Sequence, residues 1–415
     1  MVIDDKEDEA SALIRALSER DIPVLYFKGR EKELPRNPLT GIRVVFLDMK
    51  LEGMERQEPE TIASSLMQLL KKAISNVNGP YLIFAWTKHE DVLKVFQEQL
   101  GTRGLDVPKP CFLVNMEKTA CMSDGKLDYA TVSNQLGEKL GELPLFKFLT
   151  KWERTVADSQ SEVISLVSSM VEGGDVATWK DELGKILYQI ADAQSGRALE
   201  EKDETISHSA MKALDSILRD CIEKRVSLID EEFLERPANV EINDDIKATI
   251  NTRINLRDLQ TANAGTAPGN LYILRDFEHL REYLDYLSED IDSFKKGYFN
   301  SMDGLEGLKF CMLEITPICD YACRKWRASR LLVGFLVPAA LEKKIKDADF
   351  LYTTPLFSLE GHTCYLVFNF YYMALVQFNK LNDFAPRYQV RIDLLSDIQS
   401  KFSAHISRRG VVKLE

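Results

Sequence analysis

The stretch Ile42-Arg43-Val44-Val45-Phe46-Leu47-Asp48 is an apolar run that ends in a carboxylate. A short apolar run rich in β-branched and aromatic residues predicts a buried strand. A shorter apolar stretch, Met1-Val2-Ile3, opens the chain and is followed by the acidic pair Asp4-Asp5. The sequence therefore predicts two strands that each end in carboxylates, an arrangement that bears on both the fold of the chain and the chemistry of a site.

Two further apolar runs are also followed by a polar residue. The run Tyr81–Trp86 ends at Thr87, and the run Cys111–Val114 leads to Lys118. An amphipathic stretch, Ile62–Ile74, precedes them, so that predicted strands alternate with helical patterns. This alternation predicts an α/β domain with a parallel sheet. Because ligands of such sheets bind beyond the carboxyl ends of the strands, we expect these polar residues to share one site.

Convergent carboxylates at that edge of the sheet favour Mg²⁺, which binds few acids together with phosphate oxygens and water. An aspartate in such a place can accept a phosphoryl group, provided that the charge of the incoming group is neutralised. The order of these residues resembles the receiver domain of two-component response regulators. The segment after Asp48, Met49-Lys50-Leu51-Glu52-Gly53, is similar to the Gly-containing turn that follows the acceptor aspartate of receivers.

The resemblance implies a flavodoxin-like, doubly wound parallel sheet over residues 1–130, with Asp48 as the phosphoryl acceptor. Thr87 would hydrogen-bond a phosphoryl oxygen, and Lys118 would pair with the phosphoryl oxygens. The same resemblance implies a Mg²⁺ site, and its ligands would be Asp4, Asp5, Asp48 and the backbone carbonyl of Lys50. Catalysis would be limited to gain and loss of the phosphoryl group, because no independent catalytic set is visible elsewhere in the sequence.

Taken one at a time, these residues have plainer explanations. An aspartate at a strand end, such as Asp48, is commonly a turn or helix cap. The pair Asp4-Asp5 would also suit the solvated first turn of a helix. The sequence departs from the receiver pattern as well, since Thr119 stands where proline is common and Asn115 where many receivers have an aromatic residue. The agreement of several features in the right order favours the receiver interpretation.

Composition limits the possible partners. The chain has 415 residues and a net charge of −12, with an acidic excess in residues 146–300 and a slight basic excess only in residues 301–415. This charge argues against a DNA-binding output domain, which normally presents a positive face. No apolar run is long enough for a transmembrane helix, and no signal peptide is visible. The seven scattered cysteines suit reduced thiols, so we expect a cytoplasmic protein that does not contact a membrane.

Beyond the receiver, two further regions are predicted. Apolar residues at helical spacing predict a helical region over residues 140–235, which would bury its stripes within a bundle or against a second copy. Residues 236–270 are polar and predict a connector with short strands. Several β-rich runs then predict an α+β domain over residues 245–415, with a small barrel or a strongly bent sheet.

A weak metal motif lies in the last region. Cys319, Cys323, His362 and Cys364 could together supply four zinc ligands. Their spacings differ from paired CxxC knuckles, and cysteines in strands are often plain buried residues, so a structural role is favoured.

The Thr-Pro-x-Cys-Asp segment at 316–320 and the closing segments 393–399 and 408–410 resemble receiver proteins of bacterial antiphage two-component systems. Among such proteins, the chain resembles the phosphate-buffer receivers of the Detocs system. This resemblance implies a phosphate sink fed by a sensor histidine kinase, alongside a second receiver-bearing effector. The alternative is a phospho-switched effector whose β-rich domain binds a nucleotide, RNA or protein target. In a third possibility, a zinc protein uses the receiver-like domain only for docking.

Overall fold

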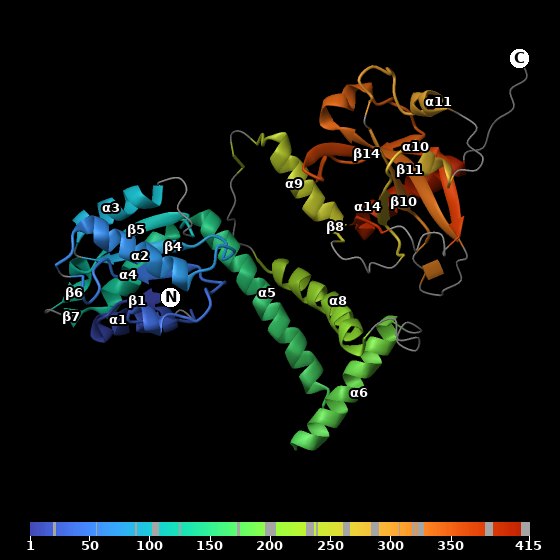
Figure 1. Cartoon of the computed structure of the whole chain (residues 1–415). Coiled ribbons are helices and arrows are strands. Elements are labelled where there is room, and N and C mark those ends of the chain that lie inside the picture. Colours follow the sequence, from blue (N-terminus) through green and yellow to red (C-terminus); the bar gives the residue numbers. More distant parts are fainter. Residues whose placement is uncertain are drawn as a thin grey trace, which may run out of the picture. The chain divides into compact units, whose positions relative to one another are not determined.

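A computed structural model of the chain describes residues 1–19, 22–54, 56–87, 89–101, 108–123, 126–171, 175–195, 205–229, 236–237, 240–259, 266–283, 290–306, 308–317, 320–321, 328–377 and 385–407. The chain divides into two compact units, Met1–Arg236 and Pro237–Glu415. Figure 1 shows an α/β part with attached helices in the first unit and a curved sheet in the second.

The first unit contains a five-stranded parallel sheet with the strand order β2-β1-β3-β4-β5. Its strands are β1 (Val2–Ile3), β2 (Tyr26–Phe27), β3 (Val44–Leu47), β4 (Leu82–Thr87) and β5 (Phe112–Glu117). The two predicted central strands, β3 and β4, are adjacent, and every residue of β4 is buried. The parallel α/β domain predicted from the apolar runs is therefore confirmed.

Helices cover both faces of this sheet. The helices are α1 (Glu7–Ser18), α2 (Pro59–Ala73), α3 (Glu90–Gly101) and α4 (Tyr129–Gly141). Alternate residues of the strands face opposite sides. Val45 and Leu47 pack with α2 and α3, whereas Phe46 packs with α1 and α4. Between β2 and β3, the chain forms only a 3-10 helix, η1 (Glu31–Glu33), so this one crossover lacks an α-helix.

A short hairpin and three long helices complete the first unit. After β5 come η2 (Thr119–Cys121), β6 (Met122–Ser123) and β7 (Lys126–Leu127), and after α4 come α5 (Pro144–Ser169), α6 (Val176–Ser195) and α8 (Ile206–Val226). The helical pattern predicted here is confirmed, and α6 and α8 pack on each other and on α5. Phe146 of α5 is buried in the sheet's core, and Glu153 accepts two hydrogen bonds from Arg43, at 2.7 and 2.9 Å.

The second unit is built on an antiparallel, curled sheet with the order β12-β14-β11-β10-β9-β15-β8, in which β13 also pairs with β14. The strands are β8 (Leu256–Asp258), β9 (Asn270–Ile273), β10 (Lys309–Glu314), β11 (Ala328–Pro338), β12 (Leu351–Thr353), β13 (Phe357–Leu359), β14 (His362–Gln377) and β15 (Tyr388–Val390). Gly334 lies where the register between β11 and β14 shifts, against the backbone of Val367. The predicted β-rich domain is confirmed, as a half-barrel with open edges.

The helices of this unit correct one prediction. They are α9 (Asp244–Asn255), α10 (Phe277–Arg281), α11 (Ile291–Lys296), η3 (Ala339–Lys344) and α14 (Ile392–Ile406). The predicted connector over 236–270 contains the helix α9, whose three isoleucines have helical spacing but stay largely exposed. After β9, the short helices α10 and α11 are each capped by an aspartate, Asp276 and Asp290.

Candidate functional site

The predicted site residues meet at the carboxyl edge of the parallel sheet. Asp4 follows β1, Asp48 follows β3, Thr87 ends β4, and Lys118 follows β5. Because these four strands are neighbours in the order β1-β3-β4-β5, their last residues come together.

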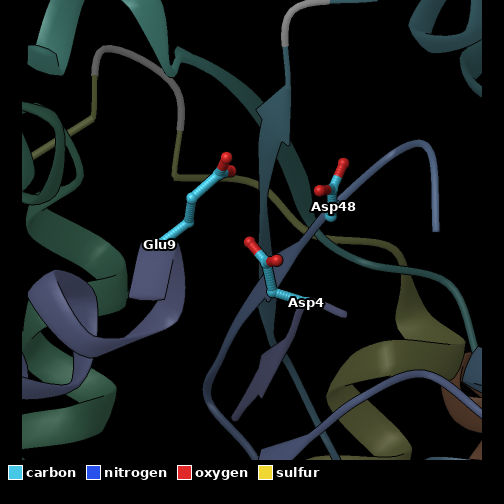
Figure 2. A group of neighbouring side chains, drawn as sticks. All are labelled: Asp4, Glu9 and Asp48. Atoms are coloured by element: carbon cyan, nitrogen blue, oxygen red, sulfur yellow. The ribbon is translucent and has the colours of Figure 1, made fainter. Parts of the chain in front are cut away.

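The ammonium group of Lys118 is the centre of the cluster. Its Nζ donates to Asp48 Oδ2 at 2.6 Å, to Glu9 Oε2 at 2.7 Å and to Asp4 Oδ2 at 3.0 Å. Figure 2 shows the three carboxylates around one small space, with Asp4 between Glu9 and Asp48. The side chains of Asp4, Asp48 and Lys118 are almost completely buried, so water screens these charges only weakly.

Local backbone turns fix the two aspartates. The backbone N–H of Lys6 donates to Asp4 Oδ1 at 2.9 Å, and that of Lys50 donates to Asp48 Oδ1 at 3.0 Å. In both turns an aspartate holds the N–H two residues further on, a usual arrangement after a strand. The second oxygen of each carboxylate is thereby directed at Lys118. The role of a turn cap therefore accounts for the Oδ1 atoms of Asp4 and Asp48, whereas their Oδ2 atoms bind Lys118.

This acidic cluster could bind a metal ion. One oxygen of each of Asp4, Glu9 and Asp48 lies within 4.8 Å of the others. Oδ1 of Asp5, next to this group, is buried without a hydrogen-bond partner, a state that is costly unless a cation or donor joins it. Carboxylate oxygens in this number suit Mg²⁺, which keeps several of its waters. The backbone N–H of Lys50 donates to Asp48, and the backbone carbonyl of Lys50 remains a predicted metal ligand.

Thr87 lies beside the cluster at the end of β4. It is buried, and its Oγ1 accepts a hydrogen bond from the backbone N–H of His89 at 2.9 Å. Its backbone carbonyl also accepts from the N–H of Lys118 at 3.3 Å, which ties the ends of β4 and β5 together. Thr87 therefore stands on the same edge as Asp48, as the strand ends predicted.

Glu9 is the one member of the cluster that the sequence interpretation missed. It lies in the first turn of α1, where acidic residues are common because they favour the positive end of the helix dipole. Its second oxygen, Oε1, accepts from Lys6 Nζ at 3.3 Å on the exposed side. The sequence offers no separate signal for Glu9, because only the tertiary fold brings the first turn of α1 to Lys118.

Burial and charge shift the pKa values of these groups in different directions. Burial, assisted by the charge of Asp48, raises the pKa of Asp4 to about 6 although Lys118 opposes the shift. Burial would raise the pKa of Glu9 too, but the hydrogen bond and the charge of Lys118 outweigh it and hold this pKa below its usual value. Burial would lower the pKa of Lys118, and the charges of Asp48 and Asp4 raise it instead.

The raised pKa of Asp4 predicts that stability depends on pH in the absence of divalent metal. Between pH 4 and 6 the folded chain retains a proton on Asp4 that the unfolded chain has released, so the free energy of unfolding falls as the pH rises through this window. The shift from 3.8 to about 6 corresponds to roughly 3 kcal/mol. Urea unfolding in EDTA at several pH values should show this slope in wild type and a smaller one in Asp4→Asn, and parallel profiles would contradict it.

The described residues include only two of the four zinc ligands considered from the sequence. Cys319 and Cys323 lie outside these residues. On β14, His362 is exposed and Cys364 is buried in an apolar cluster with Cys311. Burial raises the pKa of the Cys364 thiol to about 11, which disfavours the thiolate that a metal needs.

The described helices include none that is both long enough and apolar enough to cross a membrane. The only group of three or more potential metal-binding side chains within the described residues is that of Asp4, Glu9 and Asp48. Comparisons of the chain with protein-family models, with curated proteins and with solved structures find no match.

Proposed function

We propose that residues 1–130 form a receiver domain that accepts a phosphoryl group on Asp48 from a phosphohistidine of a sensor histidine kinase. The observation that carries this proposal is the buried ammonium of Lys118, 2.6 Å from Asp48 and 3.0 Å from Asp4 at the carboxyl edge of a parallel sheet. The strand order β2-β1-β3-β4-β5 supports it, because this is the flavodoxin-like order of doubly wound sheets.

The transfer follows from the charges in the site. An oxygen of Asp48 attacks phosphorus, the bond from phosphorus to the histidine nitrogen breaks, and the nitrogen retains the electron pair. Lys118 neutralises charge on the phosphoryl oxygens, and the hydroxyl of Thr87 donates to one of them. Mg²⁺, held by Asp5, Asp48, Asp4 and the carbonyl of Lys50, would supply further positive charge at the same oxygens.

The proposed role of this chemistry is that of a phosphate sink in a bacterial antiphage system, in the cytoplasm. The chain would draw phosphoryl groups from the kinase and so limit their delivery to a second, receiver-bearing effector. This role rests on the resemblance of the 316–320 segment and of the two closing segments to phosphate-buffer receivers. A sink needs only an acceptor site and contact with the kinase, and it needs neither DNA nor a membrane.

A second candidate is a phospho-switched effector. The unit Pro237–Glu415 has its own sheet and two apolar cores, which is more structure than a phosphate sink requires. In that case phosphorylation of Asp48 would control the binding of a nucleotide, RNA or protein target by this unit.

One substitution in cells that carry the kinase and effector genes distinguishes the two roles. If the chain is a sink, Asp48→Asn leaves more phosphoryl groups for the effector, and the effector's activity, measured as toxicity or as protection against phage, should rise. If the chain is itself the effector, the same substitution should abolish its output. An unchanged phenotype, with normal protein levels on a blot, would contradict both roles.

A further inference from the structure

Glu9 differs from the other acids of the cluster in its access to solvent. Its side chain is 21% exposed, whereas those of Asp4 and Asp48 are 0% and 7% exposed. Lys118, which the three acids share, is 4% exposed. Of these three acids, Glu9 therefore has the greatest access to solvent water.

Glu9 lies close to Asp48 across Lys118. One oxygen of Glu9 lies within 4.8 Å of oxygens of both Asp4 and Asp48, and the Lys118 ammonium bonds all three carboxylates. Glu9 Oε2 is bound to Lys118 Nζ at 2.7 Å, and this ammonium also reaches Asp48 Oδ2. A phosphoryl group on Asp48 would thus be separated from the Glu9 carboxylate by a single lysine.

The receiver chemistry proposed above does not use Glu9. Acceptance of the phosphoryl group requires Asp48, a lysine and a cation, and a further negative charge beside the site opposes the arrival of a phosphoryl group. Removal of the group by water is different, because this reaction needs an acceptor for a proton of the water. A carboxylate near the solvent side of the cluster suits that step.

We infer that Glu9 is the general base for hydrolysis of the phosphoaspartate, so that this chain both takes up and discharges phosphate. The oxygen of water attacks phosphorus, and its proton passes to Glu9. The bond between phosphorus and the Asp48 oxygen breaks, the electron pair returns to the Asp48 carboxylate, and inorganic phosphate leaves. The inference rests on the proposed phosphorylation of Asp48 and explains how a sink could be emptied.

The test measures the lifetime of the phosphoaspartate in the full chain. Protein phosphorylated with phosphoramidate and Mg²⁺ is separated from the donor, and loss of the phosphoryl group is followed by intact mass. Glu9→Gln retains a hydrogen-bond acceptor for Lys118 but cannot take a proton, so hydrolysis should slow by about 100-fold. Glu9→Asp should recover part of the rate. In D₂O, hydrolysis should slow more for wild type than for Glu9→Gln, a readout that a purely structural role would not change.

Glu7→Gln is the matched control. Glu7 lies in the same helical turn as Glu9 and pairs with Lys28 at 3.2 Å on the surface. Its substitution by glutamine removes the same charge. This variant should discharge at the wild-type rate. A wild-type lifetime in Glu9→Gln, or an equal loss of phosphoryl uptake and discharge, would overturn the role of Glu9 and leave the receiver proposal intact. Failure of wild type to take up any phosphoryl group would overturn both.

Discussion

Substitution of Asp48 by asparagine should abolish uptake of the phosphoryl group. The amide has nearly the size of the carboxylate, and its oxygen can still accept the hydrogen bond that the N–H of Lys50 gives to Asp48. It lacks the nucleophilic oxygen that attacks phosphorus, so no acyl phosphate can form. Incubation with a labelled histidine kinase and Mg²⁺ should give a base-labile label that hydroxylamine releases on wild type, and none on Asp48→Asn.

Asp8→Asn is a suitable control for this experiment. Asp8 lies on α1 close to the cluster in the sequence, but it is exposed and outside the group of converging acids. This variant should accept label as wild type does, and EDTA should suppress labelling of both. Label on Asp48→Asn, with the phosphate located on another residue by mass spectrometry, would show that Asp48 is not the acceptor.

The site could be predicted to a large extent because strand ends are visible in a sequence. Asp48 and Thr87 each close an apolar run, and in a parallel sheet the ends of neighbouring strands must converge. The apolar run that predicts this strand ends at Val114, four residues before Lys118, but β5 extends to Glu117, so that Lys118 follows the strand directly. Glu9 could not be separated from an ordinary acidic first turn, since only the tertiary fold brings α1 to Lys118.

The second unit was harder to predict for a physical reason. Its strands pair across long separations, such as β9 with β15 and β10, and no local pattern specifies those pairings. The helix α9 is also atypical, because Ile246, Ile250 and Ile254 remain exposed and only Ala248 is buried. Its start was nevertheless marked, since the side chain of Asn243 accepts a hydrogen bond from the N–H of Ile246.

Replacement of Lys118 by methionine should cause the largest loss of stability in the first unit. Methionine retains most of the volume and removes the charge, so Asp4, Glu9 and Asp48 would lie within 4.8 Å of one another without their shared cation. Breaking a buried ion pair by removing one partner costs about 3–5 kcal/mol. Urea unfolding in EDTA at pH 7 should show a loss of this size. Lys6→Met, which removes an exposed cation 3.3 Å from Glu9, should cost about 1 kcal/mol or less.

Two conditions should reduce the loss in Lys118→Met, and together they separate a charge effect from a packing effect. At pH 5 Asp4, whose pKa in wild type is already about 6, carries a proton and contributes less repulsion. Mg²⁺ at pH 7 would replace the missing positive charge and should restore part of the stability. A defect of packing would be indifferent to both. If the loss is the same at pH 5, at pH 7 and with Mg²⁺, the carboxylates do not depend on Lys118 as their counter-charge, and the site does not have the electrostatics that phosphoryl transfer to Asp48 requires.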